Sequence, residues 1–279
     1  MPNVELEPAQ RLPIFRRIAL GTWATTYDPQ VYGTLSLRME PALAYIEAFR
    51  QKTGKRLTVT HLVAKAVALA LKEMPDANAL LRMGRLYPRR SIDVFLQVVM
   101  TDAKTGKPDL SGVTLRNVDR ATLLEIVAAT EQSVVKVRTD SDPELARSRG
   151  TLARVPGLLL GRVLRVLSFL LYTLNWDLSF LGVPRDGFGS VMVTNIGSLG
   201  LEQAYAPLVP WSRVPMVIAA GMVVDEPVVE NGQILPGKVM RLSATFDHRY
   251  LDGAHAATLA RVVRRAFAEP VLAFGEPGA

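Results

Sequence analysis

Three apolar segments near the carboxyl end constrain the fold more than any other feature of the sequence. GSVMVTNIG (189–197) and VPMVIAAGMVV (214–224) each predict a buried strand, because they are short, apolar and rich in β-branched residues. KVMRLSATFDH (238–248) predicts a third strand, in which apolar and polar residues alternate over part of the length. The amphipathic segment 254–268 follows them and predicts a helix. Strands that are separated by loops and followed by a helix indicate an α+β chain with a mixed sheet.

The amino-terminal half supplies further elements of both kinds. Hydrophobic periodicity predicts helices over 41–53, 60–73 and 121–138. Apolar runs predict strands over 31–37, 92–101 and 113–118. No change of composition marks a second domain, so we expect an N-terminal arm over residues 1–13 and a single domain over residues 14–279.

Composition excludes several classes of site. The sequence has no cysteine, which excludes disulfides, thiolate metal sites and a cysteine nucleophile. With three histidines among 279 residues, we expect no metal site. The net charge of +7 suits anionic partners, but no polybasic or RGG-like tail supports nucleic acid as one of them. The first residues lack the apolar core of a signal peptide, which favours a cytoplasmic location.

The segment 155–182, VPGLLLGRVLRVLSFLLYTLNWDLSFLG, is unusually apolar. A membrane-spanning helix needs about 20 consecutive apolar residues, and this run is shorter and is interrupted by Arg162 and Arg165. We favour a buried helix or a subunit interface. An amphipathic element on an anionic membrane surface remains open, because arginines lie along and before the run.

The segment Asp247-His248-Arg249-Tyr250-Leu251-Asp252-Gly253 has the strongest potential for chemistry. It joins the end of a predicted strand to a predicted helix, a place where loops present functional groups on a rigid base. An imidazole near a carboxylate is a suitable general base at neutral pH. A histidine with an aspartate four residues later is also common in purely structural roles. We expect such roles for His61, as a surface or capping residue, and for His255.

Several other segments, taken in their order along the chain, indicate which role this histidine has. DHRYLDG at 247–253 and TNIGSLG at 194–200 resemble the signature segments of the 2-oxo acid dehydrogenase acyltransferases, the dihydrolipoamide acyltransferase family. LTVTHLVAKAVALALKEMPDANAL and VPMVIAAGMVVDEPVV resemble other parts of the same catalytic domain, in the same order. The resemblance runs from about Arg11 to Phe274 and extends to the chloramphenicol acetyltransferase-like superfamily.

The resemblance implies a fold, an assembly and a mechanism. The fold would be an open mixed β-sheet flanked by helices, in a homotrimer with active sites between subunits. His248 matches the family's general base, and Thr194 matches the hydroxyl residue that stabilises the oxyanion. Asp252 matches a residue that holds the loop, with Arg16 or Arg17 as candidate ion-pair partners. The candidate substrate-binding residues are Asn195, Gly197 and Arg249.

The implied reaction moves an acyl group between coenzyme A and a thiol such as dihydrolipoamide. Family members carry lipoyl domains ahead of this region, whereas here the resemblance begins near Arg11. We therefore expect no covalently bound cofactor, with coenzyme A or acyl-CoA as substrate and any lipoyl group supplied by a lipoyl-carrying protein. The arginine cluster 82–90 is expected to be solvated, with coenzyme A phosphates as the alternative.

The apolar insertion at about 155–182 leaves two other interpretations open. One is a catalytically degenerate scaffold, a trimer or a cage of trimers. The other is a peripheral membrane acyltransferase with a hydrophobic acceptor.

Overall fold

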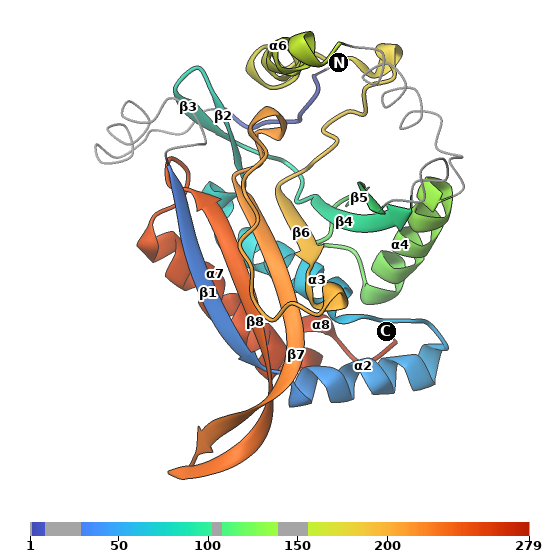
Figure 1. Cartoon of the computed structure of the whole chain (residues 1–279), viewed down its shortest axis with the longest axis vertical. Coiled ribbons are helices and arrows are strands. Elements are labelled where there is room, and N and C mark those ends of the chain that lie inside the picture. Colours follow the sequence, from blue (N-terminus) through green and yellow to red (C-terminus); the bar gives the residue numbers. More distant parts are fainter. Residues whose placement is uncertain (1, 9–28, 102–107, 139–155, 279) are drawn as a thin grey trace.

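The computed structural model describes residues 2–8, 29–101, 108–138 and 156–278 of the chain. A six-stranded sheet has the order β1-β8-β7-β6-β4-β5, in which β6 runs parallel to β4 and β7 and the other neighbours are antiparallel. Helices α3 and α7 lie against one face of this sheet (Figure 1). The predicted α+β fold with an open mixed sheet flanked by helices is confirmed.

The elements around the sheet have the following bounds. The strands of the sheet are β1 Gln30–Arg38, β4 Val94–Thr101, β5 Pro108–Leu115, β6 Val191–Asn195, β7 Met216–Glu230 and β8 Gln233–Asp247. The helices are α2 Glu40–Thr53, α3 Val59–Glu73, α4 Leu123–Arg138, α6 Gly157–Ser168, α7 Gly253–Ala268 and the short α8 Pro270–Phe274. A separate hairpin pairs β2 Ala79–Arg82 with β3 Arg85–Pro88.

Helix α3 forms the centre of the core. Its residues from His61 to Ala68 are all buried, which fits a helix enclosed by the sheet and by neighbouring helices. The helix begins with a capping box, in which the Thr58 backbone N–H donates to His61 Nδ1 at 3.2 Å. The prediction of a capping role for His61 is confirmed, and a surface position is wrong, because the side chain is 6 % exposed.

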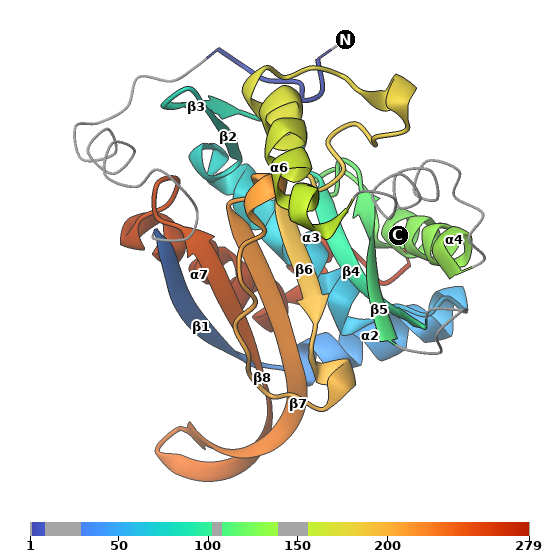
Figure 2. The same cartoon turned by 45° about the horizontal axis from the view of Figure 1, so that its top comes forward.

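Strands β7 and β8 extend much further than predicted. They pair in register from Val223 with Met240 to Glu230 with Gln233, and the ribbon projects from the body in Figures 1 and 2. Asn231 and Gly232 close it with φ values of 50° and 78°, as a type I′ hairpin turn requires. The outer part of the ribbon is exposed, so its sequence lacks the apolar run that marks a buried strand.

The 155–182 segment forms α6 and then a π-helix, Phe169–Thr173. One side packs into a small cluster in which Leu171, Tyr172 and Leu178 meet Val4 of the N-terminal arm and Leu80 of β2. The other side is exposed, so the prediction of a buried helix holds for only one side. Among the helices that the structure describes, none has the length and apolar character needed to cross a bilayer.

Candidate active site

The turn between β8 and α7 fixes the His248 imidazole in one orientation. The His248 backbone N–H donates to the carbonyl of Pro29 at 2.8 Å, which ties the turn to the start of β1. Nδ1 of the ring lies 2.5 Å from the carbonyl oxygen of Leu251. A carbonyl oxygen can only accept, so Nδ1 carries a proton, and in the neutral ring Nε2 is the nitrogen that can accept one. This tautomer can take a proton through Nε2.

A buried ion pair supports the turn from beneath. Asp247 is fully buried, and its carboxylate accepts from Nε of Arg249 at 3.0 Å and from Nη2 at 2.6 Å. The Arg249 backbone N–H donates to the same carboxylate at 2.9 Å. A buried charge is tolerated when it is paired and hydrogen-bonded in this way. These contacts of Arg249 are structural, and its predicted binding of substrate stays a prediction.

Two further side chains anchor the loop that follows His248. The Asp252 carboxylate caps α7, accepting from the backbone N–H groups of Ala254 and His255 and lying 2.6 Å from His255 Nδ1. The Tyr250 hydroxyl accepts from the backbone N–H of Leu81, and its burial raises the pKa of that phenol to about 12. Asp252 therefore positions the loop as a helix cap. Its predicted partners Arg16 and Arg17 lie outside the described residues.

Thr194 lies near the end of β6, where a second turn begins. In the part of the chain that the structure describes, its hydroxyl makes no hydrogen bond and stays available to a ligand. Asn195 fixes the turn, because its Nδ2 donates to the Thr60 hydroxyl at 2.8 Å and its Oδ1 accepts from the Ser198 backbone at 3.0 Å. Gly197 passes close to β7. A Cβ at that position would lie 2.6 Å from the Gly221 carbonyl oxygen, so the turn requires glycine.

The sheet register separates Thr194 from His248 within one chain. Thr194 pairs with Ala219 of β7, and Ala219 pairs with Ser243 of β8, five residues before His248. At about 3.3 Å per residue and about 4.8 Å per strand, the two Cα atoms are roughly 19 Å apart. Two side chains cannot close this gap. If both residues serve one site, they come from different copies of the chain.

A cavity of about 380 Å³ lies between the sheet and helices α3 and α7. Leu251, whose carbonyl holds the His248 ring, lines it together with Phe246 and Ile218. Apart from Tyr32 and Thr34, its described lining is apolar and uncharged. The cavity can accept an apolar group, but not the phosphates of coenzyme A.

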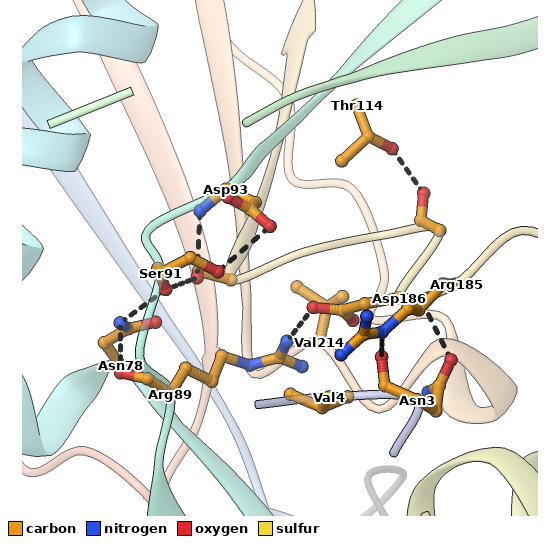
Figure 3. A network of polar contacts seen from close by, with 12 residues as sticks. Asn3, Val4, Asn78, Arg89, Ser91, Asp93, Thr114, Arg185, Asp186 and Val214 are labelled. Carbon is orange, nitrogen blue, oxygen red and sulfur yellow. Dashed lines mark hydrogen bonds and ion pairs between the residues drawn. The ribbon is translucent and has the colours of Figure 1, made fainter. Parts of the chain in front are cut away.

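The arginine cluster 82–90 is not the solvated patch that we expected. Arg89 is buried, and its Nη1 donates to the Asp186 carboxylate at 2.5 Å (Figure 3). Arg90 pairs with Glu5 and Glu7, and Arg82 donates to a backbone carbonyl and lies over an aromatic ring. These arginines bind the N-terminal arm and the segment after α6 to the body, so only Arg85 remains exposed without a described partner.

Sequence reasoning identified the two turns but missed the groups that hold them. The carbonyl of Leu251, the hydroxyl of Thr60 and the phenol of Tyr250 each make a positioning hydrogen bond. A backbone carbonyl leaves no signal in the sequence. Thr58 and His61 have the spacing of a capping box, but His61 stands where Glu or Gln is usual. The sequence pattern therefore leaves open whether His61 caps the helix or lies on the surface.

Comparisons with known proteins agree on one family. The family model described as 2-oxoacid dehydrogenases acyltransferase (catalytic domain) matches residues 19–145 and 186–274. Both turns of the site lie in the second matched stretch. The unmatched residues 146–185 contain α6 and the π-helix.

Two curated relatives cover most of the chain. The acetyltransferase component of the acetoin cleaving system of Bacillus subtilis is 22 % identical over 79 % of this chain and 44 % of its own length. The succinyltransferase component of the 2-oxoglutarate dehydrogenase complex of Saccharomyces cerevisiae is 25 % identical over 97 % of this chain and 47 % of its own length. The chain thus spans somewhat less than half the length of these relatives.

Solved structures share the fold. The cubic core of the pyruvate dehydrogenase multienzyme complex has a TM-score of 0.66 at 20 % identity, covering 95 % of this chain and 93 % of its own. A probable dihydrolipoamide acetyltransferase from Listeria monocytogenes has a TM-score of 0.64 at 16 % identity, covering 94 % and 95 %. A chloramphenicol acetyltransferase reaches 0.51 at 15 % identity, covering 92 % and 98 %. Because the family model matches most of its residues, the chain belongs to the 2-oxoacid dehydrogenase acyltransferase family, in the part that forms the catalytic domain.

Proposed function

We propose that the protein transfers an acyl group between coenzyme A and a thiol such as dihydrolipoamide. The observation that carries the proposal is the hydrogen bond from His248 Nδ1 to the Leu251 carbonyl, which presents Nε2 as a base. Family membership supports acyl transfer as the reaction class. The lipoyl group is supplied by another domain or protein. Coenzyme A binds noncovalently, as a substrate.

The reaction proceeds in two proton-coupled steps. Nε2 of His248 removes the proton from the attacking thiol, and the thiolate adds to the thioester carbonyl carbon. The tetrahedral oxyanion then accepts a hydrogen bond from the Thr194 hydroxyl, which stabilises it more than the starting carbonyl. When this intermediate collapses, the original C–S bond breaks and the imidazolium returns its proton to the departing thiolate.

We also propose that each site forms between two subunits of a homotrimer. The register places Thr194 and His248 of one chain roughly 19 Å apart, so one chain cannot supply both groups to one thioester. A cyclic trimer brings the Thr194 turn of one subunit against the His248 turn of the next, three times over. By analogy with the same family, we also propose that such trimers can form a cage and that a lipoyl-carrying protein is a partner. A cytoplasmic location is compatible with these partners.

The test is acyl exchange between acetyl-CoA and dihydrolipoamide by the wild type and by His248→Ala. We expect the variant to lose about 10²–10⁴ in turnover while its coenzyme A affinity stays close to that of the wild type. Unchanged turnover in the variant would remove His248 as the base. Coenzyme A binding without exchange in the wild type, for acetyl, branched and longer acyl donors alike, would instead favour the catalytically degenerate scaffold.

A further inference from the structure

The inserted helix exposes an apolar stripe that the described part of the chain leaves uncovered. Leu159, Val163 and Val166 of α6 and Phe169 of the following turn are between 36 % and 58 % exposed. Their spacing of four, three and three residues places them on one side of the helix. The opposite side carries Ser168 and Leu171, which are buried against the body. The helix therefore packs on one side and presents an apolar stripe on the other.

A second apolar group lies at the same end of the molecule. Trp176, Phe180 and Leu181 follow the helix and are between 55 % and 78 % exposed. Figures 1 and 2 both show α6 and the short helix Ser179–Leu181 at the end of the molecule from which the N-terminal arm starts. Clustered aromatic and aliphatic side chains of this size are uncommon on a free surface and mark an interaction site.

The charges on α6 are of one sign, and one carboxylate, that of Asp177, lies in the turn that follows. Arg162 and Arg165 lie on α6 next to the apolar stripe, and the helix contains no acidic residue. Long arginine side chains can cover apolar surface with their methylene groups while the guanidinium reaches polar headgroups. A helix with an apolar stripe, a flanking pair of arginines and too few residues to span is typical of one that lies in the plane of a membrane surface.

We propose that α6 and the turns after it dock this protein on an anionic lipid bilayer. The apolar stripe would enter the boundary between headgroups and acyl chains, and Arg162 and Arg165 would bind anionic headgroups. An isologous contact with a second copy is less suitable, because it brings the arginines of the two helices together without an acidic partner on either helix. A heterologous contact within a trimer is an outcome that the test below distinguishes from membrane binding. The proposal concerns the insertion and is independent of the acyl-transfer chemistry.

The test is co-sedimentation of the full chain with phosphatidylcholine vesicles, prepared with and without phosphatidylglycerol. We expect binding to the anionic vesicles that weakens at high salt, because screening reduces the contribution of the arginines. Val163→Glu/Val166→Glu should reduce binding by at least about tenfold. Arg162→Gln/Arg165→Gln should reduce it by roughly 30-fold on anionic vesicles and little on neutral ones.

A matched control is Val271→Glu/Leu272→Glu, which makes the same change at exposed residues of α8, away from the insertion. This control should bind vesicles like the wild type. A wild type that stays in the supernatant, or a Val163→Glu/Val166→Glu variant that binds equally well, would overturn the proposal. Light scattering of the Val163→Glu/Val166→Glu variant measures its assembly. If this variant no longer assembles and the wild type does not bind vesicles, the stripe is instead a contact between copies. Acyl exchange with soluble substrates should be unchanged where only vesicle binding is lost, whereas loss of a contact between copies would also lower exchange, because the proposed active site lies between subunits.

Discussion

The two turns of the active site and the inserted segment are held in opposite ways. Around His248, each described anchor is internal: a carbonyl holds the ring, a buried ion pair supports the turn and an aspartate caps the next helix. The insertion is fixed on one side by a small apolar cluster and the Arg89–Asp186 pair, and its outer side is apolar and exposed. The loop that carries the base is thus anchored within one chain, whereas the insertion leaves an apolar surface available to a partner.

The two buried ion pairs give the largest expected effects and compare the regions directly. Arg249→Met leaves the Asp247 charge buried without its partner, and Arg89→Met does the same to Asp186. Each change should lower the free energy of unfolding by about 3–5 kcal/mol, measured by denaturant titration. Only Arg249→Met should also lower turnover per folded molecule.

The matched control for these variants is Arg265→Met, which removes an exposed pair with Glu269 on the surface of the molecule. It should leave the free energy of unfolding nearly unchanged. A similar loss in all three variants would show that burial does not set the strength of these pairs.

Removal of one hydroxyl separates the chemistry from the scaffold. Thr194→Val keeps the side-chain shape and deletes the oxyanion donor, so turnover should fall by about 10²–10³ with little change in stability. Thr173→Val makes the same change in the π-helix of the insertion and should leave turnover at the wild-type level. Equal turnover in the two variants would exclude Thr194 as the donor.

The pH dependence of stability tests the capping box beneath the Thr194 turn. Burial lowers the pKa of His61 from 6.5 to about 4, so the folded protein keeps this imidazole neutral where the unfolded chain protonates it. The resulting stability is fully present above pH 6.5 and is lost as the pH falls toward about 4, to a limit of about 3 kcal/mol.

The variant that isolates this effect is His61→Gln, which retains a capping-box side chain but cannot titrate. Denaturant titrations across this pH range should show a smaller loss of stability in the variant than in the wild type. Parallel curves for the two proteins would contradict a buried neutral His61.

Two glycines give the smallest effects, with opposite signs. Gly197→Ala places a Cβ 2.6 Å from the Gly221 carbonyl oxygen and should destabilise the protein by about 1–3 kcal/mol. At Gly161 of α6, an added Cβ meets nothing within 4 Å, so Gly161→Ala should stabilise by about 0.5–1 kcal/mol through helix propensity. Thermal unfolding of both variants measures the difference, and a shift of the same sign in both would contradict it.

The sequence predicted the interior of this fold better than its margins. The cores of β6 and β7 are continuous apolar runs, and burial on both faces leaves that signal, whereas apolar and polar residues alternate along the core of β8. The outer ribbon and the hairpin β2–β3 were missed, because exposed strands lack the run and four-residue strands are too short to show a period. Met83 and Gly84, which close that hairpin with positive φ values, were not recognised as a turn.

The sequence predicted which residues form the site but not how far apart they lie. His248, Thr194 and Asp252 were identified from motifs, whereas the distance between the first two depends on strand register, which no local pattern encodes. The role of Asp252 as a helix cap could have been inferred from its place before α7. The arginines near residue 89 were misjudged because their acidic partners lie about 80 to 100 residues away in sequence.

Subunit mixing tests the central claim, that His248 of one subunit and Thr194 of the next act on one thioester. His248→Ala and Thr194→Val subunits carrying different tags would be refolded or co-expressed together, and the trimers assayed for acyl exchange. Every mixed trimer then contains one interface with both wild-type groups, so an equal mixture should regain about a quarter of wild-type turnover although each parent is nearly inactive. A mixture that is no more active than its parents would contradict a site shared between subunits.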